Sequence, residues 1–215
     1  MNFPTKSRHR TPGRRLLLAT LATALLSSAC APLVLGGAMV GGALMATDRR
    51  TSGTQLEDQG IELKAGSRIR EQLGERVHVS VNSYNRLVLI TGEARNEADR
   101  TLLTTIASGI ENVQSVLNET AVMGNSSLGS RSNDVLIATK IRANLVDARD
   151  LISNAFYVVV ERGDVFIMGR VSEREATRAV EIARGVGGVK KVVRVFEILS
   201  EDELARIVPK PAPAK

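Results

Sequence analysis

The feature that most constrains the fold of this 215-residue chain is an internal repeat. Residues 107–116 and 183–192 share the pattern A-x-G-[IV]-x-x-V-x-x-V at a spacing of 76 residues. Two further pairs of segments match in the same order: 89–92 with 166–169 at a spacing of 77, and 68–73 with 140–145 at a spacing of 72. Three ordered matches indicate two copies of one structural unit.

Each copy is predicted to fold in the order helix, strand, strand, helix, strand. In the first helix of each copy apolar residues recur every fourth position, which is typical of a helix with one buried face. These residues are Ile61, Ala65, Ile69 and Leu73 in copy one and Ile137, Ile141 and Leu145 in copy two. The expected strands cover 77–84, 87–91 and 113–122, and then 156–161, 165–168 and 189–199, with hairpin turns at Asn85-Arg86 and Arg162-Gly163.

The second helix of each copy is expected to begin after Asn96 or after Ser172, and Glu175 completes a capping box with Ser172. Gly109 and Gly185 are predicted to end these helices in the left-handed conformation that glycine favours. A strand-helix-strand connection is right-handed and pairs its strands in parallel. We therefore expect an α+β fold of two tandem αββαβ sandwiches, each with both helices on one face of its sheet.

The N-terminus has the order of a secretory signal peptide. Residues 1–15 carry five basic residues and no acidic one, and an uncharged run rich in Leu and Ala continues to Cys30. The end of this run, LLSSAC at 25–30, resembles the lipobox of bacterial lipoproteins, in which the cysteine is acylated and becomes the mature N-terminus. We therefore predict a signal peptide over 1–29 and lipidation at Cys30, the only cysteine of the chain.

An uncleaved transmembrane anchor is the alternative, because no charged residue occurs from Leu16 to Ala46, which is long enough to span a bilayer. Arg14 and Arg15 leave the export route open between the general and the twin-arginine pathways. The Gly-rich apolar stretch 31–46 either inserts in the membrane or lies on it. The predicted organisation is a signal peptide at 1–29, the acylated cysteine with a tether and linker at 30–60, domains at 61–123 and 133–199 joined by a linker at 124–132, and a C-terminal tail at 200–215.

Both copies resemble the BON domain family. The glycine-anchored strand-helix-strand unit carries the resemblance, and its most specific parts are NSYNRLVLITG at 82–92 and VSEREA at 171–176. Two copies behind a lipobox are similar to the dual-BON outer-membrane lipoproteins of Gram-negative bacteria, over about residues 48–199. The resemblance implies a lipid-anchored protein on the periplasmic face of the outer membrane that binds phospholipid and supports envelope integrity. Ala31 agrees with outer-membrane sorting, since no retention Asp follows the cysteine.

Composition argues against several other functions. Five of the six formal positive charges leave with residues 1–29, so the mature chain is near neutral and lacks the charge of a nucleic-acid-binding protein. With no Trp, four Phe and two Tyr, the core must be aliphatic, and platforms for stacking bases are not expected. His78 is the only histidine after the leader and is predicted to face solvent. We therefore predict no catalytic site, no cofactor and no metal site.

The two copies differ in charge, which favours copy two as the part that contacts an anionic membrane. Residues 61–123 carry seven basic and eight acidic residues, whereas 133–199 carry eleven and nine. Leu136 lies off the predicted buried stripe of its helix, close to cations, and such a residue can insert shallowly while the cations pair with lipid phosphates. The predicted phospholipid-binding residues are Val135, Leu136, Lys140, Arg142 and Ala143.

Two other interpretations stay open at this point. Leu136 would be buried if its helix packed against copy one. The chain would be a scaffold if the exposed faces of its sheets bound another envelope protein or peptidoglycan. The carboxylates Glu173, Glu175 and Glu181 are interpreted as surface partners of neighbouring arginines.

Overall fold

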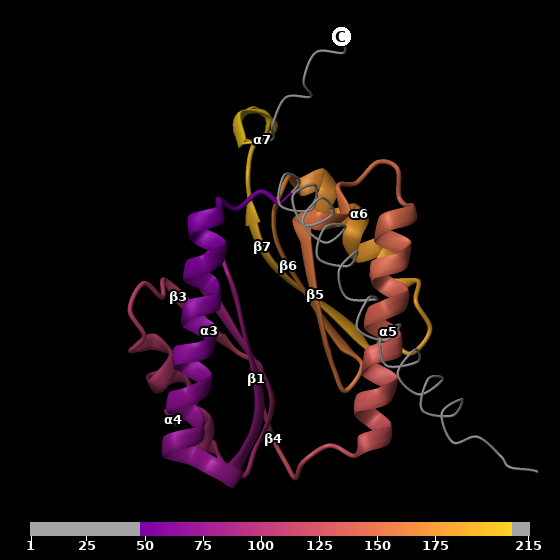
Figure 1. The fold of residues 1–215 in the computed structure, drawn as a ribbon. Coiled ribbons are helices and arrows are strands. Elements are labelled where there is room, and N and C mark those ends of the chain that lie inside the picture. The colour runs from indigo at the N-terminus through magenta and orange to yellow at the C-terminus, as the bar shows by residue number, and fades with distance from the viewer. Residues whose placement is uncertain (1–47, 208–215) are drawn as a thin grey trace, which may run out of the picture. The chain divides into compact units, whose positions relative to one another are not determined.

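The structure, a computed structural model, describes residues 48–207 (Figure 1). The predicted signal peptide, Cys30, the tether up to residue 47 and the end of the tail from residue 208 lie outside the described residues. The described residues belong to one compact unit. They contain an aliphatic core in each repeat and an apolar cluster shared by both.

Both repeats show the predicted order of elements, which confirms the α+β class. The first repeat consists of α3 (Ser52–Leu73), β1 (Val77–Tyr84), β2 (Leu87–Ala94), α4 (Glu97–Ser108), β3 (Ser115–Asn118) and β4 (Ala121–Val122). The second consists of α5 (Leu128–Asp147), β5 (Phe156–Glu161), β6 (Asp164–Val171), α6 (Glu173–Arg184) and β7 (Lys191–Ile198). Short 3-10 helices, η2 (Gly74–Arg76) and η3 (Ser153–Ala155), precede β1 and β5, and α7 (Glu201–Ile207) follows β7.

The two sheets share one topology. In the first, β1 pairs antiparallel with β2, and β2 pairs in parallel with β3 and β4. In the second, β5 pairs antiparallel with β6, and β6 pairs in parallel with β7. The parallel pairs follow the strand-helix-strand connections, as expected. In each sheet the hairpin's first strand, β1 or β5, is an edge strand.

Each repeat has an aliphatic core between its two helices and one face of its sheet. In the first repeat, Ile61 and Ile69 of α3 and Leu103 of α4 pack against Val88 and Ile90 of β2. The core of the second repeat is equivalent and includes the predicted stripe of Ile137, Ile141 and Leu145. Burying one such side chain contributes about 1.5–3 kcal/mol. The prediction that both helices cover one face of the sheet is therefore correct.

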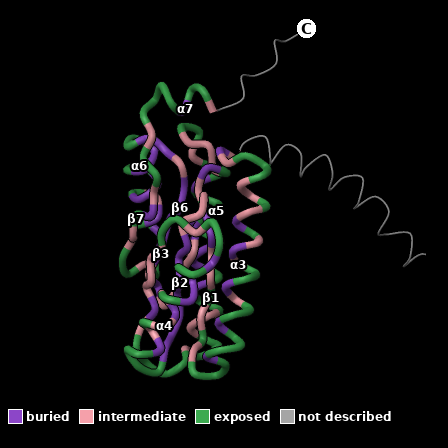
Figure 2. The backbone as a smooth tube through the Cα atoms, turned by 90° about the vertical axis from the view of Figure 1, so that its left-hand side faces the viewer, coloured by how far each residue is buried: buried purple, intermediate pink, exposed green. Residues whose placement is uncertain are grey.

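The opposite faces of the two sheets pack against each other. Tyr84 and Leu89 of the first repeat share a buried cluster with Phe166, Met168 and Val195 of the second. Nearly all residues of β2 and β6 are buried, and the tube in Figure 2 is coloured purple for buried residues. The scaffold interpretation required these sheet faces to be exposed, and the structure shows that the residues in this cluster are not.

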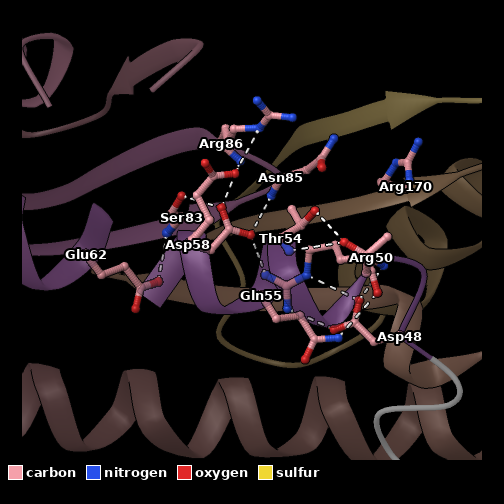
Figure 3. Close-up of polar contacts among 12 residues, drawn as sticks. Asp48, Arg50, Thr54, Gln55, Asp58, Glu62, Ser83, Asn85, Arg86 and Arg170 are labelled. Atoms are coloured by element: carbon pink, nitrogen blue, oxygen red, sulfur yellow. Dashed lines mark hydrogen bonds and ion pairs between the residues drawn. The ribbon is translucent and has the colours of Figure 1, made fainter. Parts of the chain in front are cut away.

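A buried aspartate in the first helix of each repeat holds the following hairpin turn. Asp58 and Asp134 are 2% and 6% exposed and lie 76 residues apart. Each accepts two hydrogen bonds of 2.8 Å from backbone N–H groups of the turn. The donors to Asp58 are Asn85 and Arg86 (Figure 3), and the donors to Asp134 are Arg162 and Gly163. All four turn residues have positive φ, as two-residue hairpins require. These bonds stabilise a conformation that costs energy for residues other than glycine.

The helices of the two repeats keep a constant spacing of 76 residues. The residues that cap their N-termini are Thr51 and Ser127 for the first helices and Asn96 and Ser172 for the second. The predicted match of 68–73 with 140–145 is therefore wrong by about one helical turn. The error has a physical origin, because an apolar residue every fourth position looks nearly the same after a shift of one turn.

Both first helices begin earlier than predicted. Helix α3 begins at Ser52 and α5 at Leu128, so most of the predicted linker before residue 61 and part of the one before residue 133 are helical. Thr51 and Ser127 each accept a hydrogen bond from the backbone N–H three residues later, which stabilises these helix starts. The polar composition of both stretches concealed the helical turns.

The predicted role of two glycines is wrong. Gly109 and Gly185 follow α4 and α6 with φ of −84° and −71°, so neither takes the left-handed conformation. That conformation occurs three residues later, at Asn112 and Gly188, with φ of 68° and 98°. The chain therefore leaves both helices through a right-handed turn and reverses only as it approaches the last strand.

The last strand of the first repeat is interrupted, whereas a continuous strand was predicted. Asn118 at the end of β3 donates to the carbonyl of Arg100 at 2.8 Å and accepts from the N–H of Thr120 at 3.0 Å. An asparagine that bonds to the backbone two residues ahead favours a turn over a strand. Strand β4 resumes the parallel pairing with β2 after this turn.

Candidate functional site

Helix α5 is apolar on two opposite sides. One side carries the buried residues Ile137, Ile141 and Leu145. On the other side Leu128 and Val135 are 79% and 65% exposed. At 100° per residue, positions 128, 135 and 146 fall within a narrow sector of the helix. We call the exposed set Leu128, Val135, Leu136 and Val146 the outer apolar line.

The structure places the predicted phospholipid-binding residues on this outer side. Val135, Leu136, Lys140 and Ala143 are exposed, and Leu136 is 58% exposed, so the alternative in which it packs against the first repeat is wrong. Lys140 and Arg142 lie on opposite flanks of the outer apolar line by helical geometry. Arg142 also donates to the carbonyl of Val158 on β5 at 2.6 Å.

Sequence reasoning missed the two ends of this line. Leu128 precedes the predicted start of the domain, and Val146, the last residue of the helix predicted to bind lipid over 134–146, is not among the predicted contact residues. Val146 is 67% exposed. The spacing of 7 and 11 residues between positions 128, 135 and 146 indicates that they share one side of a helix, since both spacings are close to a whole number of helical turns.

The charges on α5 favour an anionic partner. Arg131, Lys140 and Arg142 are its basic residues. Of its two carboxylates, Asp134 is buried and binds the hairpin turn, which leaves Asp147 as the exposed one. Helix α3 also exposes two apolar residues, Leu56 and Leu63. There, however, three basic residues are balanced by Glu57, Glu62 and Glu71, so α5 is the more cationic of the two first helices.

A groove of about 340 Å³ lies between β1 of the first repeat and α5 and β5 of the second. Its lining includes His78, Ser80 and Asn82 on one side and Arg131 and Arg142 on the other. Val135 of the outer apolar line also lines the groove. His78 is exposed as predicted, but no local sequence pattern indicates that it borders a groove shared by both repeats.

Inside this groove a tyrosine links the two repeats. The hydroxyl of Tyr157 donates to Oδ1 of Asn82 at 3.1 Å. Burial raises the pKa of Tyr157, and the nearby charge of Glu62 raises it further. The phenol therefore keeps its proton at neutral pH and acts as a hydrogen-bond donor.

A second link between the repeats is a buried ion pair. Nη1 of Arg162, in the β5–β6 turn, lies 3.0 Å from Oε1 of Glu93, whose side chain is fully buried in β2. The same nitrogen donates to the carbonyl of Gly92 at 3.0 Å. Glu161 lies 3.5 Å from Arg162, and its pKa is raised by burial and by the charge of Glu93.

Arg49, just ahead of the first repeat, is bound to the second. It donates to both carboxylate oxygens of Glu175 at 2.7 and 2.8 Å and to the carbonyl of Arg170 at 2.8 Å. The side chains of Arg49 and Glu175 are only 3% and 6% exposed, so the interpretation of Glu175 as a surface partner of neighbouring arginines is wrong. The capping box with Ser172 is present as predicted. Burial alone raises the pKa of Glu175, but the hydrogen bonds from Arg49 and Ser172 outweigh it, and the pKa is lowered.

The next residue, Arg50, is bound to the first repeat. Its guanidinium pairs with Asp58 at 2.9 Å and with Asp48 at 2.8 Å. The same group stacks over the ring of Tyr84, 4.1 Å from the centroid. Figure 3 shows Arg50 between Asp48 and Asp58. Residues 48–50, which we call the entry segment, therefore contact both repeats.

The described residues contain neither a candidate metal site nor a membrane-spanning helix. Within residues 48–207, no group of three or more His, Cys, Asp or Glu side chains is placed to hold a metal ion. In the same part of the chain, none of the helices combines the length and apolar character that crossing a membrane requires. Cys30, the predicted lipidation site, lies outside the described residues.

Known proteins resemble this chain over most of its length. Outer membrane lipoprotein DolP of Haemophilus influenzae is 34% identical over 192 residues, covering 88% of this chain and 98% of that protein. The 21 kDa hemolysin of Actinobacillus pleuropneumoniae is 32% identical over 151 residues, covering 69% and 78%. The C-terminal domain of CdsD, a structural protein of the type III secretion system of Chlamydia trachomatis, gives a TM-score of 0.28 at 12% identity over 61% of this chain and 96% of that one.

The family assignment rests on both repeats. The BON domain matches residues 58–124 and 133–200, so each structural repeat corresponds to one match. The αββαβ order, the internal spacing of 76 residues and the two matches agree. This chain therefore belongs to the BON domain family and contains two BON domains.

Proposed function

We propose that this protein is an outer-membrane lipoprotein, anchored through Cys30 on the periplasmic face, that binds anionic phospholipid through its second BON domain and supports envelope integrity. The anchor and the location are supported by the lipobox-like sequence before Cys30 and by the likeness to a relative named as an outer membrane lipoprotein over nearly its whole length. The lipid contact is supported by helix α5.

The observation that carries the lipid contact is the outer apolar line. Four apolar side chains of α5 are 58–79% exposed on the side opposite its buried stripe. Exposed apolar residues that repeat along a helix between cations are suited to lie in the interface of an anionic bilayer. Each Lys or Arg near such a surface contributes about 1 kcal/mol, so Arg131, Lys140 and Arg142 supply part of the affinity.

This contact can be weak and still be effective. An acyl chain contributes about 0.8 kcal/mol per buried methylene, and two or more chains give stable anchoring. The anchor would hold α5 at a high local concentration of lipid, which strengthens a second contact without new interactions. We propose a binding role and no enzymatic one. The groove beside α5 contains His78, and the hydrogen bonds of the other side chains that line it hold the fold together: Tyr157 bonds to Asn82, and Arg142 bonds to the carbonyl of Val158.

Vesicle binding tests the contact. Residues 45–215 carrying Leu136→Asp should bind vesicles of phosphatidylglycerol and phosphatidylethanolamine at least about tenfold more weakly, because 1.4 kcal/mol of lost insertion energy is a factor of ten. Co-sedimentation measures the affinity. Leu63→Asp is the matched control. Leu63 is 73% exposed on α3, and its replacement by Asp adds the same charge as Leu136→Asp. Equal affinities for the unchanged protein and Leu136→Asp would contradict the proposal, as would equal binding to uncharged phosphatidylcholine vesicles.

The anchor has an independent test. Mass spectrometry of the mature protein should find an N-terminal peptide that begins at Cys30 and carries the mass of a diacylglyceryl thioether. The same peptide from Cys30→Ala should be absent, because signal cleavage in lipoproteins follows acylation. A mature protein that retains residues 1–29, or that begins elsewhere without lipid, would show that this part of the proposal is wrong.

A further inference from the structure

The groove between the repeats has the chemistry of an anion site that is built by both BON domains. Val77, Val79 and Val81 of β1 pack toward α3 in the first core. The alternating residues His78, Ser80 and Asn82 therefore point to the other face of the strand, where they line the groove. Donor groups of the first domain thus face the cationic helix of the second.

One amide nitrogen in this wall lacks a partner among residues 48–207. Nδ2 of Asn82 is buried and donates to no acceptor in this part of the chain, while Oδ1 of the same side chain accepts from Tyr157. Turning the amide over would exchange the two atoms and leave the other end unpaired. A buried donor without an acceptor costs about 1–3 kcal/mol, and a ligand oxygen in the groove would remove this cost.

Two guanidinium groups on the facing wall are held in position by hydrogen bonds to uncharged groups. Arg142 uses Nη2 on the carbonyl of Val158, and Arg131 uses Nε and Nη2 on Ser126. Among residues 48–207, no carboxylate lies within ion-pair distance of either arginine. Arginine positioned in this way is well suited to bind phosphate oxygens.

The two carboxylates that line the groove already have partners. Asp134 accepts hydrogen bonds from the β5–β6 turn, and Glu161 pairs with Arg162. The volume of about 340 Å³ is at the lower end of the range of about 300–1,000 Å³ for small-molecule sites. This volume suits a polar head group better than two acyl chains. The groove also includes Val135, so chains leaving it would run along the outer apolar line.

We propose that this groove binds the phosphodiester head group of a glycerophospholipid, with Arg131 and Arg142 facing the phosphate and Asn82, Ser80 and His78 of the first BON domain completing the site. The inference rests on the proposed function, since it specifies how the lipid bound by α5 is recognised. In this arrangement the first BON domain also contacts the lipid, whereas the outer apolar line belongs to the second domain alone.

The test separates the head group from the rest of the lipid. The water-soluble probe glycerophosphoglycerol, which has no acyl chains, is titrated into residues 45–215 and followed through backbone amide NMR shifts. We expect shifts at residues 78–82 and in α5. Asn82→Asp replaces the amide with a carboxylate of nearly the same shape, which can still accept from Tyr157, and should weaken probe binding at least tenfold. Gln59→Glu, an exposed change of equal charge on α3 of the same domain, should leave it within twofold.

Further variants and probes distinguish this inference from the proposed function. Leu136→Ser removes an apolar contact without adding charge, so it should weaken vesicle binding but leave probe binding within twofold. If vesicles bind the unchanged protein and Asn82→Asp equally, the groove is not the head-group site, although the proposed function stands. If no vesicle binds the unchanged protein, the proposed function itself fails. Inorganic phosphate that binds as tightly as the probe would overturn the assignment to a lipid head group.

Discussion

At the residue scale, two buried ion pairs join parts of the chain that are far apart in sequence. Glu175 forms the capping box with Ser172, three residues away, but its charged partner is Arg49, 126 residues away. Glu93 is fully buried in β2, and Arg162 of the other repeat reaches it. Which carboxylate each arginine meets is therefore set by how the repeats pack.

The pair of Arg49 and Glu175 predicts a pH dependence of stability. The pKa of Glu175 is lowered by folding, so its ionised form stabilises the protein above the unfolded value of about 4.3, and this stabilisation is lost as the pH falls through the folded pKa. Glu175→Gln should lower the free energy of unfolding at pH 7 by about 1–3 kcal/mol, and less at pH 3.

Urea unfolding at pH 7 and at pH 3 measures this difference. Glu62 and Glu161 have pKa values raised by burial, so their contributions change with pH in the opposite direction, and only the comparison with the unchanged protein isolates Glu175. Glu181→Gln, on the exposed side of α6, is the control. If Glu175→Gln lowers the free energy of unfolding equally at both pH values, the ionisation of Glu175 does not contribute to stability as predicted.

At the element scale, periodicity predicted which helix faces are buried but not where the helices begin. The stripe of Ile137, Ile141 and Leu145 is buried as expected. The sequence predicts linkers where the first turns of α3 and α5 lie, because a helix start that projects beyond the core has no apolar period to identify it. Leu128, at the beginning of α5 and of the outer apolar line, was lost for this reason. The predicted phospholipid-binding residues lie on the exposed side of α5, and their binding to lipid stays a prediction.

At the scale of the whole molecule, the packing of the two sheets was not predicted, although the sequence contains a signal for it. Strands β2 and β6 include the uninterrupted apolar runs LVLI at 87–90 and VFIM at 165–168. Such runs are typical of strands covered on both faces, whereas a strand with one exposed face alternates. Leu89 and Phe166 accordingly fill the cluster between the repeats. The groove depends on this packing, so its composition could not be read from either repeat alone.

The buried pair between the repeats predicts a large effect on stability. Arg162→Ala would leave Glu93 charged and without its partner in a fully buried position, which costs about 3–5 kcal/mol when a buried pair is broken. Urea unfolding of residues 45–215 measures the loss. Arg174→Ala, an exposed change on α6, should cost less than about 0.5 kcal/mol. The double variant Arg162→Leu with Glu93→Leu should recover most of the stability, because no charge is then left buried. If the double variant is as unstable as Arg162→Ala, the unpaired charge of Glu93 is not the cause of the lost stability.

The entry segment has a mechanical consequence. Arg49 is fastened to the second BON domain and Arg50 to the first, so tension along the chain ahead of residue 48 is shared by both domains from the moment it is applied. A pull at this end cannot separate the two domains until the bidentate ion pair of Arg49 with Glu175, which is shielded from water, breaks. In a lipid-anchored protein, a pull from the membrane anchor would thus act on both domains at once. The groove between them would then keep its shape under tension.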